Sequence, residues 1–217
     1  MTEEQAVYIV DNDAGVRTSL SMLLESENLR HKVYASAAAF LTEIEKGTRG
    51  CLILDIRMPD MNGLQLQLEL QKQNIFIPII FVSGHGDIAI AVRAMRHGAL
   101  DFISKPYSEE QLLGSIRSAL AFEAQKQKRL IDHEELLLRM HTLSKREREV
   151  FELVSEGLSN KLAARRLDVS ERTIECHRSQ VIKKMGAHSL AELVRMRLET
   201  ERPVYAPIFS KDVTPQL

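Results

Sequence analysis

Short apolar runs alternate with amphipathic segments through the first 121 residues, and this alternation limits the possible folds more than any other feature. The runs lie at 6–10, 32–34, 51–54, 77–82 and 101–104. Most are rich in Val, Ile and Phe and have the length of buried strands. The segments between them place apolar residues at helical spacing; in the fourth, Ile88, Val92 and Met95 share one face. The pattern predicts a doubly wound α/β domain with a five-stranded parallel sheet.

The rest of the chain contains no comparable strand pattern. Residues 122–141 lack Gly and Pro and are expected to continue the preceding helix as a connector. Residues 142–200 read as a separate all-α domain of four short helices. Residues 201–217 contain three of the six prolines and are expected to be a poorly ordered tail. The sequence thus predicts a domain at 1–121, a helical linker, a second domain and a tail.

Composition excludes several classes of protein. No run approaches 18 apolar residues, and the acidic N-terminus lacks the features of a secretory signal. Cys51 and Cys176 lie far apart and neither has a neighbour at metal-ligand spacing, which argues against a disulfide framework. We therefore expect a protein of the reducing cytoplasm without a membrane partner.

Chemically reactive residues follow four of the predicted strands. The triplet Asp11-Asn12-Asp13 follows the first strand, Asp55 the third, Ser83 the fourth and Lys105 the fifth. In a parallel sheet these ends meet at one edge. Clustered carboxylates repel one another unless a cation lies among them, and Mg2+ suits carboxylate and phosphate oxygens. An aspartate in such a site can act as the nucleophile that accepts a phosphoryl group.

The same strand ends carry a family resemblance. The segments VYIVDND (7–13), LILDIRMPDMNG (52–63), IIFVSGHGD (79–87) and DFISKP (101–106) resemble the receiver domain of bacterial two-component response regulators. The resemblance implies that Asp55 is the phosphoacceptor, Ser83 the switch hydroxyl and Lys105 the phosphoryl-binding lysine. It also implies that the main-chain carbonyl of Arg57 contacts Mg2+ and that Phe102 is the aromatic switch residue.

Two further expectations follow from the resemblance, together with one departure from it. Lys105-Pro106 is expected to be a cis peptide, and Gly63 to permit a tight turn after Pro59 through a positive φ. The family usually has two adjacent acids after the first strand, whereas this chain has Asp11-Asn12. The metal site is therefore expected to comprise Asp11, Asn12, Asp55 and Arg57, with one negative charge fewer than usual. Asp13 contributes only if the chain bends.

A phosphatase of the haloacid-dehalogenase type is the alternative enzyme interpretation. Asp11 would then be the nucleophile and Asp13 the acid/base, because a DxD motif after a strand is typical of that family. This interpretation leaves LDIRMPDMNG unexplained. The receiver interpretation predicts no enzyme beyond self-catalysed phosphorylation and dephosphorylation of Asp55.

The second domain carries the pattern of a helix-turn-helix. Ser144 and Glu147 form a capping-box sequence, and Gly157 is placed to end that first helix. A short helix follows with Leu162, Ala163 and Leu167 facing inward. A tight turn at 168–170 then leads into a third helix, capped by Ser170 and stopped by Gly186. Seven basic and three acidic residues in 160–184 favour a nucleic-acid partner.

Residues 143–194 resemble a LuxR-type DNA-binding domain along their whole length. The third helix then becomes the recognition helix in the major groove. The DNA-contacting residues expected from the pattern are Lys161, Arg172, Thr173, Glu175, Cys176, His177, Arg178, Ser179, Lys183 and Lys184. The segment 190–198 forms a fourth helix, which either dimerises or closes the domain core.

Together these features predict a phosphorylation-controlled bacterial transcription regulator of the NarL/FixJ group, closest to its FixJ-like branch. A sensor histidine kinase supplies the phosphoryl group, and Mg2+ is the expected cofactor. Phosphorylation is expected to drive homodimerisation through the fourth helix and fifth strand, around Val92, Arg96 and Phe102. The dimer binds double-stranded promoter DNA, with RNA polymerase as a further partner. The competing interpretation is a constitutive DNA-binding regulator whose receiver is vestigial because of Asn12.

Overall fold

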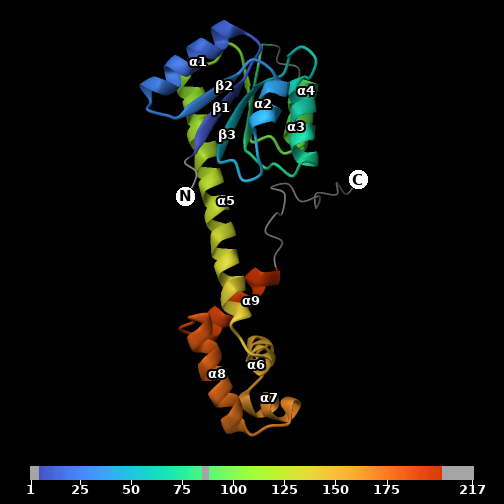
Figure 1. Cartoon of the computed structure of the whole chain (residues 1–217), viewed down its shortest axis with the longest axis vertical. Helices are drawn as coiled ribbons and strands as arrows, with labels where there is room; N and C mark the ends of the chain where they lie inside the picture. The colour runs from blue at the N-terminus through green and yellow to red at the C-terminus, as the bar shows by residue number, and fades with distance from the viewer. Residues whose placement is uncertain (1–4, 85–87, 202–217) are drawn as a thin grey trace. The chain divides into compact units, whose positions relative to one another are not determined.

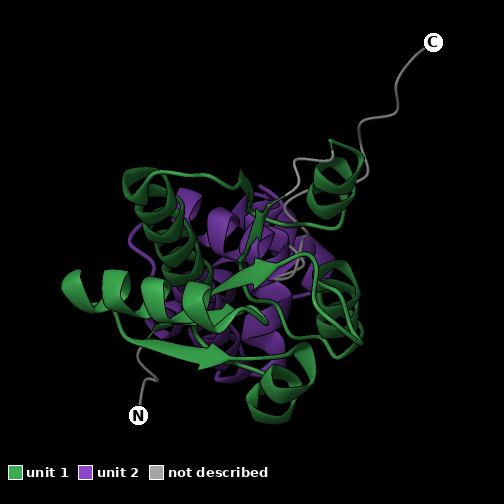
Figure 2. Cartoon of the chain, turned by 90° about the horizontal axis from the view of Figure 1, so that it is seen from above, with its two compact units in different colours: residues 1–126, 207–217 green, residues 127–206 purple. Residues whose placement is uncertain are grey.

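The computed structural model describes residues 5–84 and 88–201, which fall into two compact units divided between Lys126 and Gln127 (Figures 1 and 2). The first unit contains a five-stranded sheet and the second is helical. The strands are β1 (Ala6–Val10), β2 (His31–Tyr34), β3 (Gly50–Asp55), β4 (Ile79–Ser83) and β5 (Asp101–Ser104). β4 begins two residues later than the sequence predicts, because Pro78 has no N–H to donate to a strand ladder.

All strand pairs of the sheet are parallel, in the order β2-β1-β3-β4-β5. The first-unit helices are α1 (Ala14–Ser26), α2 (Ala37–Glu43), α3 (Gly63–Lys72) and α4 (Ile88–Arg96), with the first part of α5 (Glu109–His141). Helices α1 and α5 cover one face, and α2, α3 and α4 cover the other (Figure 1). The predicted doubly wound five-stranded α/β fold is confirmed.

Side-chain alternation along each strand builds two separate cores. In β1, Val7 and Ile9 pack with Leu24 of α1 and Ile116 of α5. The intervening β1 side chains join the opposite core with Phe40 of α2, Leu66 of α3 and Phe81 of β4. Burial on both faces explains the nearly continuous apolar strands, as expected for a parallel sheet.

The structure shows that residues of two predicted apolar helix faces are exposed, and it corrects one of these predictions. Ile88 and Val92 of α4 are 79% and 43% exposed, and Ala94 is the helix's buried residue. In the second unit, the sequence pattern predicts that Leu162 faces inward. Leu162 is 52% exposed, although it lies beside the buried Ala163. Apolar spacing marks a helix face, but it does not distinguish a buried face from an exposed one.

The second unit contains the latter part of α5 followed by α6 (Lys145–Ser155), α7 (Asn160–Leu167), α8 (Glu171–Met185) and α9 (Leu190–Glu201). Each predicted cap is present: Ser144 and Glu147 form the capping box of α6, Ser170 caps α8, and Gly186 ends α8 at φ 68°. Gly157 follows α6 at φ 87°.

The second unit's core joins helices that are distant in sequence. Leu136 of α5 packs with Phe151 of α6, Val181 of α8 and Leu193 of α9. Leu193 therefore closes the core, while Leu190 and Leu198 of the same helix are exposed. Within residues 5–84 and 88–201, no helix is long and apolar enough to cross a membrane.

Candidate functional site

The carboxyl ends of β1, β3, β4 and β5 bring the predicted acidic-site residues to one edge of the sheet. Asp55 is the last residue of β3 and pairs in register with Val82 of β4. Ser83 ends β4, while Asp11 and Lys105 directly follow β1 and β5. Asp11 and Ser83 are buried, so the site is not a fully exposed cluster.

Lys105 joins the two carboxylates. Its Nζ lies 3.3 Å from Asp11 Oδ2 and 3.4 Å from Asp55 Oδ1. Burial and the neighbouring Asp11 charge raise the pKa of Asp55, although Lys105 and the main-chain N–H of Arg57 oppose this shift. Burial disfavours the charged form of Lys105, but the two carboxylates outweigh burial and raise its pKa. The two carboxylates and one ammonium leave this group with a formal net charge of −1.

The loop after β1 separates the three residues of the Asp11-Asn12-Asp13 triplet. Asp13 Oδ1 accepts from the N–H groups of Gly15 and Val16, at 2.7 and 3.3 Å, and so caps α1. The Asp13 carboxylate is thus used by the helix. Asn12 is exposed. No group of three or more His, Cys, Asp or Glu side chains is arranged to hold a metal among residues 5–84 and 88–201.

Asp11 itself is held by three donors. Its Oδ1 accepts from the N–H of Asp13 at 2.8 Å, and its Oδ2 faces Lys105. Arg17 of α1 donates from Nη1 to the Asp11 main-chain oxygen at 2.8 Å. The role of Arg17 cannot be predicted from the sequence, because a single arginine on a helix carries no recognisable signal. Its contact fixes the β1–α1 loop against the acidic site.

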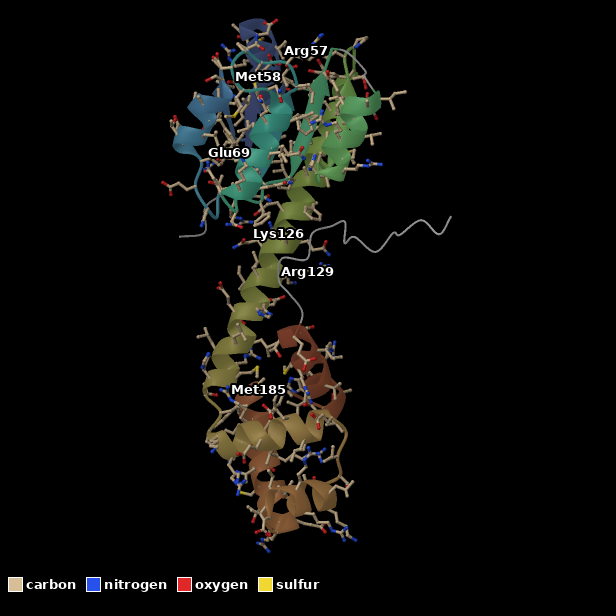
Figure 3. The ribbon with its side chains drawn as sticks, turned by 90° about the vertical axis from the view of Figure 1, so that its right-hand side faces the viewer. Arg57, Met58, Glu69, Lys126, Arg129 and Met185 are labelled. Atoms are coloured by element: carbon tan, nitrogen blue, oxygen red, sulfur yellow. The ribbon has the colours of Figure 1, made fainter. Side chains whose placement is uncertain are left out.

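Asp55 is positioned by the segment that follows it. The N–H of Arg57 donates to Asp55 Oδ2 at 2.7 Å. Arg57 is exposed and Met58 is buried in the core, and both side chains are labelled in Figure 3. The Arg57 main chain therefore contacts the Asp55 carboxylate through its N–H.

Glycine is required at position 63 because of close packing and not because of the predicted positive φ. The positive φ in the turn belongs to Asp60, at 64°, and Gly63 does not have a positive φ. A Cβ on Gly63 would lie 2.4 Å from the main-chain oxygen of Asp55 and 3.1 Å from the Phe81 ring. The close approach of α3 to the end of β3 requires glycine here.

The predicted aromatic switch residue and dimer-surface residues lie on β5 and α4. Phe102 of β5 is half-buried, with its ring centroid 6.4 Å from that of Phe81. The Lys105-Pro106 peptide is cis, as expected. Val92 and Arg96 are exposed on α4. The predicted motif residues His85, Gly86 and Asp87 lie outside the described residues.

The second unit holds α7 and α8 in a helix-turn-helix. Asp168 adopts a left-handed conformation at φ 52°, which turns the chain between the two helices. The buried side of α8 consists of Ile174, Val181 and Met185, with Ile182 half-buried. Figure 3 labels Met185 in this unit.

Most predicted DNA-contacting side chains face solvent. The exposed members are Lys161, Arg172, Glu175, Cys176, Ser179, Lys183 and Lys184. Thr173 and His177 are half-buried, and the Thr173 hydroxyl lies 2.8 Å from that of Ser170. The exposed residues that belong to α8 give this helix a polar side that faces solvent.

Two of the predicted DNA contacts have partners within the unit. Arg178 donates from Nη1 to Asn160 Oδ1 at 3.1 Å and so joins α8 to α7. Lys184 Nζ lies 2.6 Å from Glu147 Oε2 and 3.1 Å from the main-chain oxygen of Thr142. Lys184 thereby joins the end of α8 to the capping box of α6.

Known proteins match both units. The family model described as response regulator receiver domain matches residues 7–117, and the model described as bacterial regulatory proteins, luxR family, matches 141–197. Response regulator protein TmoT of Ectopseudomonas mendocina is 46% identical over 200 residues, which are 92% of this chain and 90% of TmoT. Transcriptional regulatory protein FixJ of Bradyrhizobium diazoefficiens is 40% identical over 198 residues, 91% of this chain and 97% of FixJ.

Solved structures agree with these relatives. The response regulator StyR matches with a TM-score of 0.79 and 36% identity, over 91% of this chain and 100% of StyR. Full-length FixJ from B. japonicum matches with a TM-score of 0.56 and 39% identity, over 92% of this chain and 98% of FixJ. Both proteins resemble this chain over nearly its whole length.

A parallel sheet with Asp11, Asp55 and Lys105 at its edge, joined in one chain to a helix-turn-helix unit, defines a DNA-binding response regulator. The chain belongs to the response regulator family with a LuxR-type DNA-binding domain, and within it resembles FixJ and TmoT. It is a phosphorylation-controlled transcription regulator that has a sensor kinase as partner and binds DNA. This assignment displaces the phosphatase alternative, in which Asp13 would be an acid/base.

Proposed function

We propose that Asp55 accepts the phosphoryl group from a sensor histidine kinase. The observation that carries this proposal is the contact of Lys105 with both Asp11 and Asp55, since it places a phosphoryl-binding cation beside the acceptor carboxylate. An Asp55 oxygen attacks phosphorus as the P–N bond of the donor's phosphohistidine breaks. The released imidazole takes up a proton from water, and Lys105 pairs with the incoming phosphoryl oxygens.

The donor set fits one Mg2+ ion. Asp11 and Asp55 supply carboxylates, Asn12 a side-chain carbonyl and Arg57 a main-chain carbonyl, all oxygen ligands of the type that Mg2+ prefers. When bound by these residues, the ion would supply positive charge that offsets the negative charge of the acceptor and the phosphoryl group. Asp13 is assigned to the α1 cap instead.

Phosphorylation acts on the surface formed by α4 and β5. Ser83 moves to donate a hydrogen bond to the phosphoryl group, and Phe102 turns inward beside Phe81. The surface around Val92, Arg96 and Phe102 then forms a homodimer. Its apolar content supports this assignment, because Val92 and Ile88 are exposed in the single chain.

Dimerisation places two recognition helices on paired half-sites of promoter DNA. Lys161, Arg172 and Lys183 contact phosphates, while Glu175, Cys176 and Ser179 face base edges. Bound at the promoter in the cytoplasm, the dimer contacts RNA polymerase. We assign residues 1–121 to the receiver, 122–141 to the linker helix and 142–200 to the DNA-binding domain.

Intact mass spectrometry after acetyl phosphate treatment tests the proposal. We expect one added phosphoryl group in the full chain, dependent on Mg2+ and absent in Asp55→Asn. Promoter-fragment binding by the treated chain should tighten, and binding by Asp55→Asn should not respond. Phosphate-dependent dimerisation that persists in Asp55→Asn would refute the assignment of Asp55.

Asn12 favours a second candidate function, a constitutive DNA-binding regulator, because it removes one charge from the metal site. This candidate predicts identical DNA affinity with and without the sensor kinase, ATP and Mg2+. Restoring the usual acid in Asn12→Asp would then establish a response that the wild-type chain lacks. An equal response of both chains to the kinase would eliminate this candidate.

A further inference from the structure

Helix α4 has a narrow apolar contact with the receiver core. Of its nine residues, Ala94 is the one fully buried, and Ile90 and Met95 are partly buried against the same core. Ile88 and Val92 expose much of their surface. A helix with one fully buried residue takes less of its stability from packing than a helix with a fully buried face. Polar contacts to neighbouring elements therefore contribute to its position.

The C-terminal turn of α4 is held by Gln67 of α3. The Gln67 side chain is 1% exposed, and its Nε2 donates to the main-chain oxygens of Ala94 and His97, both at 3.1 Å. Gln71, one turn further along α3, also donates to the His97 oxygen. The Ala94 oxygen also accepts from the main-chain N–H of Ala99 at 3.1 Å, so the Gln67 amide is a second donor there. The last carbonyls of a helix lack partners within the helix, and the Gln67 amide therefore adds a cap from a neighbouring element. Figure 1 shows α3 and α4 side by side.

The N-terminal end of α3 lies against the main chain of Asp55, the proposed phosphoacceptor. Gly63 begins α3, and its N–H donates to the main-chain oxygen of Ile56 at 2.9 Å. The close approach of Gly63 to the Asp55 carbonyl leaves no space for a Cβ. Gln67 lies four residues, about one helical turn, after Gly63. A single turn of helix thus separates the Asp55 main chain from the residue that holds α4.

The acceptor atom of Gln67 has an unfavourable environment. Its Oε1 is buried and has no hydrogen-bond donor among residues 5–84 and 88–201. A buried acceptor without a donor costs free energy that a solvated one does not. The contact between Gln67 and α4 therefore includes the free-energy cost of an unpaired Oε1. A different placement of α4, in which a donor or water reaches Oε1, would remove this cost.

We propose that Gln67 is a positioning residue that holds α4 in the unphosphorylated receiver and releases it when Asp55 is phosphorylated. Displacement of α3 at the Asp55 carbonyl moves Gln67 away from the Ala94 and His97 oxygens, and α4 shifts. The inference rests on the proposed function for its consequence, because α4 is the proposed dimer surface. The positioning of α4 by Gln67 does not depend on the proposed function, because it is argued from the hydrogen bonds of Gln67.

Hydrogen exchange of the full chain tests the hold directly. Gln67→Met removes both N–H donors and the unpaired oxygen while keeping a similar length, and Gln67→Leu is a second apolar variant. We expect the amides of residues 88–96 to exchange about tenfold faster in the unphosphorylated variants, equivalent to about 1.4 kcal/mol. Gln73→Met is the matched control, because Gln73 is exposed and its side chain donates to Glu69 on its own helix.

A second readout separates this role from a merely structural one. We expect the urea midpoint of Gln67→Met to stay close to that of the wild-type chain, because removing an unpaired buried oxygen offsets the lost donors. Unchanged exchange of residues 88–96 in both apolar variants, or an equal increase in Gln73→Met, would overturn the proposal. A large loss of global stability in both apolar variants would do so too, since Gln67 would then support the whole receiver.

Sedimentation with and without acetyl phosphate distinguishes this proposal from the proposed function. We expect unphosphorylated Gln67→Met to dimerise about tenfold more tightly than the unphosphorylated wild-type chain. Faster α4 exchange in a chain that fails to dimerise even when phosphorylated would support the hold and refute the dimer surface. Normal phosphate-dependent dimerisation with unchanged α4 exchange in the variants would refute the hold and retain the dimer surface.

Discussion

Replacing Glu123 tests how strongly a buried ion pair stabilises the receiver. Glu123 lies on α5 with its side chain 7% exposed, and Arg49, before β3, is 19% exposed. Arg49 Nε and Nη2 donate to the two carboxylate oxygens at 3.1 and 3.2 Å, and Gln5 donates to the same carboxylate. Removing one partner of a buried pair costs about 3–5 kcal/mol. Because Arg49 keeps some contact with water, we expect about 3 kcal/mol for Glu123→Leu.

Tyrosine fluorescence during urea unfolding measures this loss. The chain has no Trp, and three of its four tyrosines, Tyr8, Tyr34 and Tyr107, lie in residues 1–126. With a denaturant slope of about 1.5 kcal/mol per M, a loss of about 3 kcal/mol lowers the midpoint by about 2 M. The double variant Arg49→Met/Glu123→Leu should recover most of this loss, because apolar side chains can replace both members of a buried pair.

Two results would refute the reasoning about this pair. A Glu123→Leu midpoint within the equivalent of about 0.5 kcal/mol of the wild-type value would mean that the pair behaves as a surface salt bridge. A double variant less stable than either single variant would mean that packing around the side chains, rather than charge desolvation, controls stability.

Three further predictions concern Gly63, Glu147 and the basic side chains of the second unit. Gly63→Ala should destabilise the receiver by about 1–3 kcal/mol in the same urea assay, because the new Cβ meets the Asp55 carbonyl; wild-type stability would contradict the close approach. The hydrogen bond from Lys184 lowers the pKa of Glu147 to about 2 from an ordinary 4.5, so its stabilising effect is complete above about pH 4.5 and is lost as the pH falls toward 2. In acid unfolding followed by circular dichroism, the loss of folded signal between about pH 4.5 and 2 should therefore be less steep for Glu147→Gln than for the wild-type chain. Identical profiles for the two chains would exclude a link between Glu147 protonation and stability. Lys161→Gln should reduce the slope of log binding constant against log salt concentration by about one unit. Lys184→Gln should instead lower the stability of the second unit with little change in this slope. Equal slope changes in the two variants would mean that Lys184 contacts DNA.

Local sequence chemistry predicted the elements well. The bounds of β1 and β5 agree with the sequence prediction, and Ser144, Ser170 and Gly186 cap helices where expected. Strand runs and caps depend on residues close together in the chain, so sequence alone contains the necessary information. The meeting of Asp11, Asp55 and Lys105 was also predictable, because parallel strands place their carboxyl ends at one edge.

The features that could not be predicted from the sequence depend on contacts between segments that are distant in the chain. Gln67 and Glu123 resemble ordinary polar residues of amphipathic helices, yet both are buried by partners far along the chain. The partner of Lys184 is likewise 37 residues away. Leu162 shows the opposite limit, since apolar spacing alone placed it inward and the structure exposes it. Only the packing of whole elements determines which polar side chains are enclosed.

The three donors around Asp11 have a consequence for conformational entropy. Backbone, lysine and arginine groups from separate elements fix this carboxylate and its main chain. Ordering a mobile side chain during binding typically costs about 0.5–1.5 kcal/mol. At Asp11 that loss of rotamer freedom occurs when the receiver folds. If the proposed Mg2+ binds there, it would meet a preorganised ligand in Asp11, whereas binding to the exposed Asn12 side chain would still cost rotamer freedom.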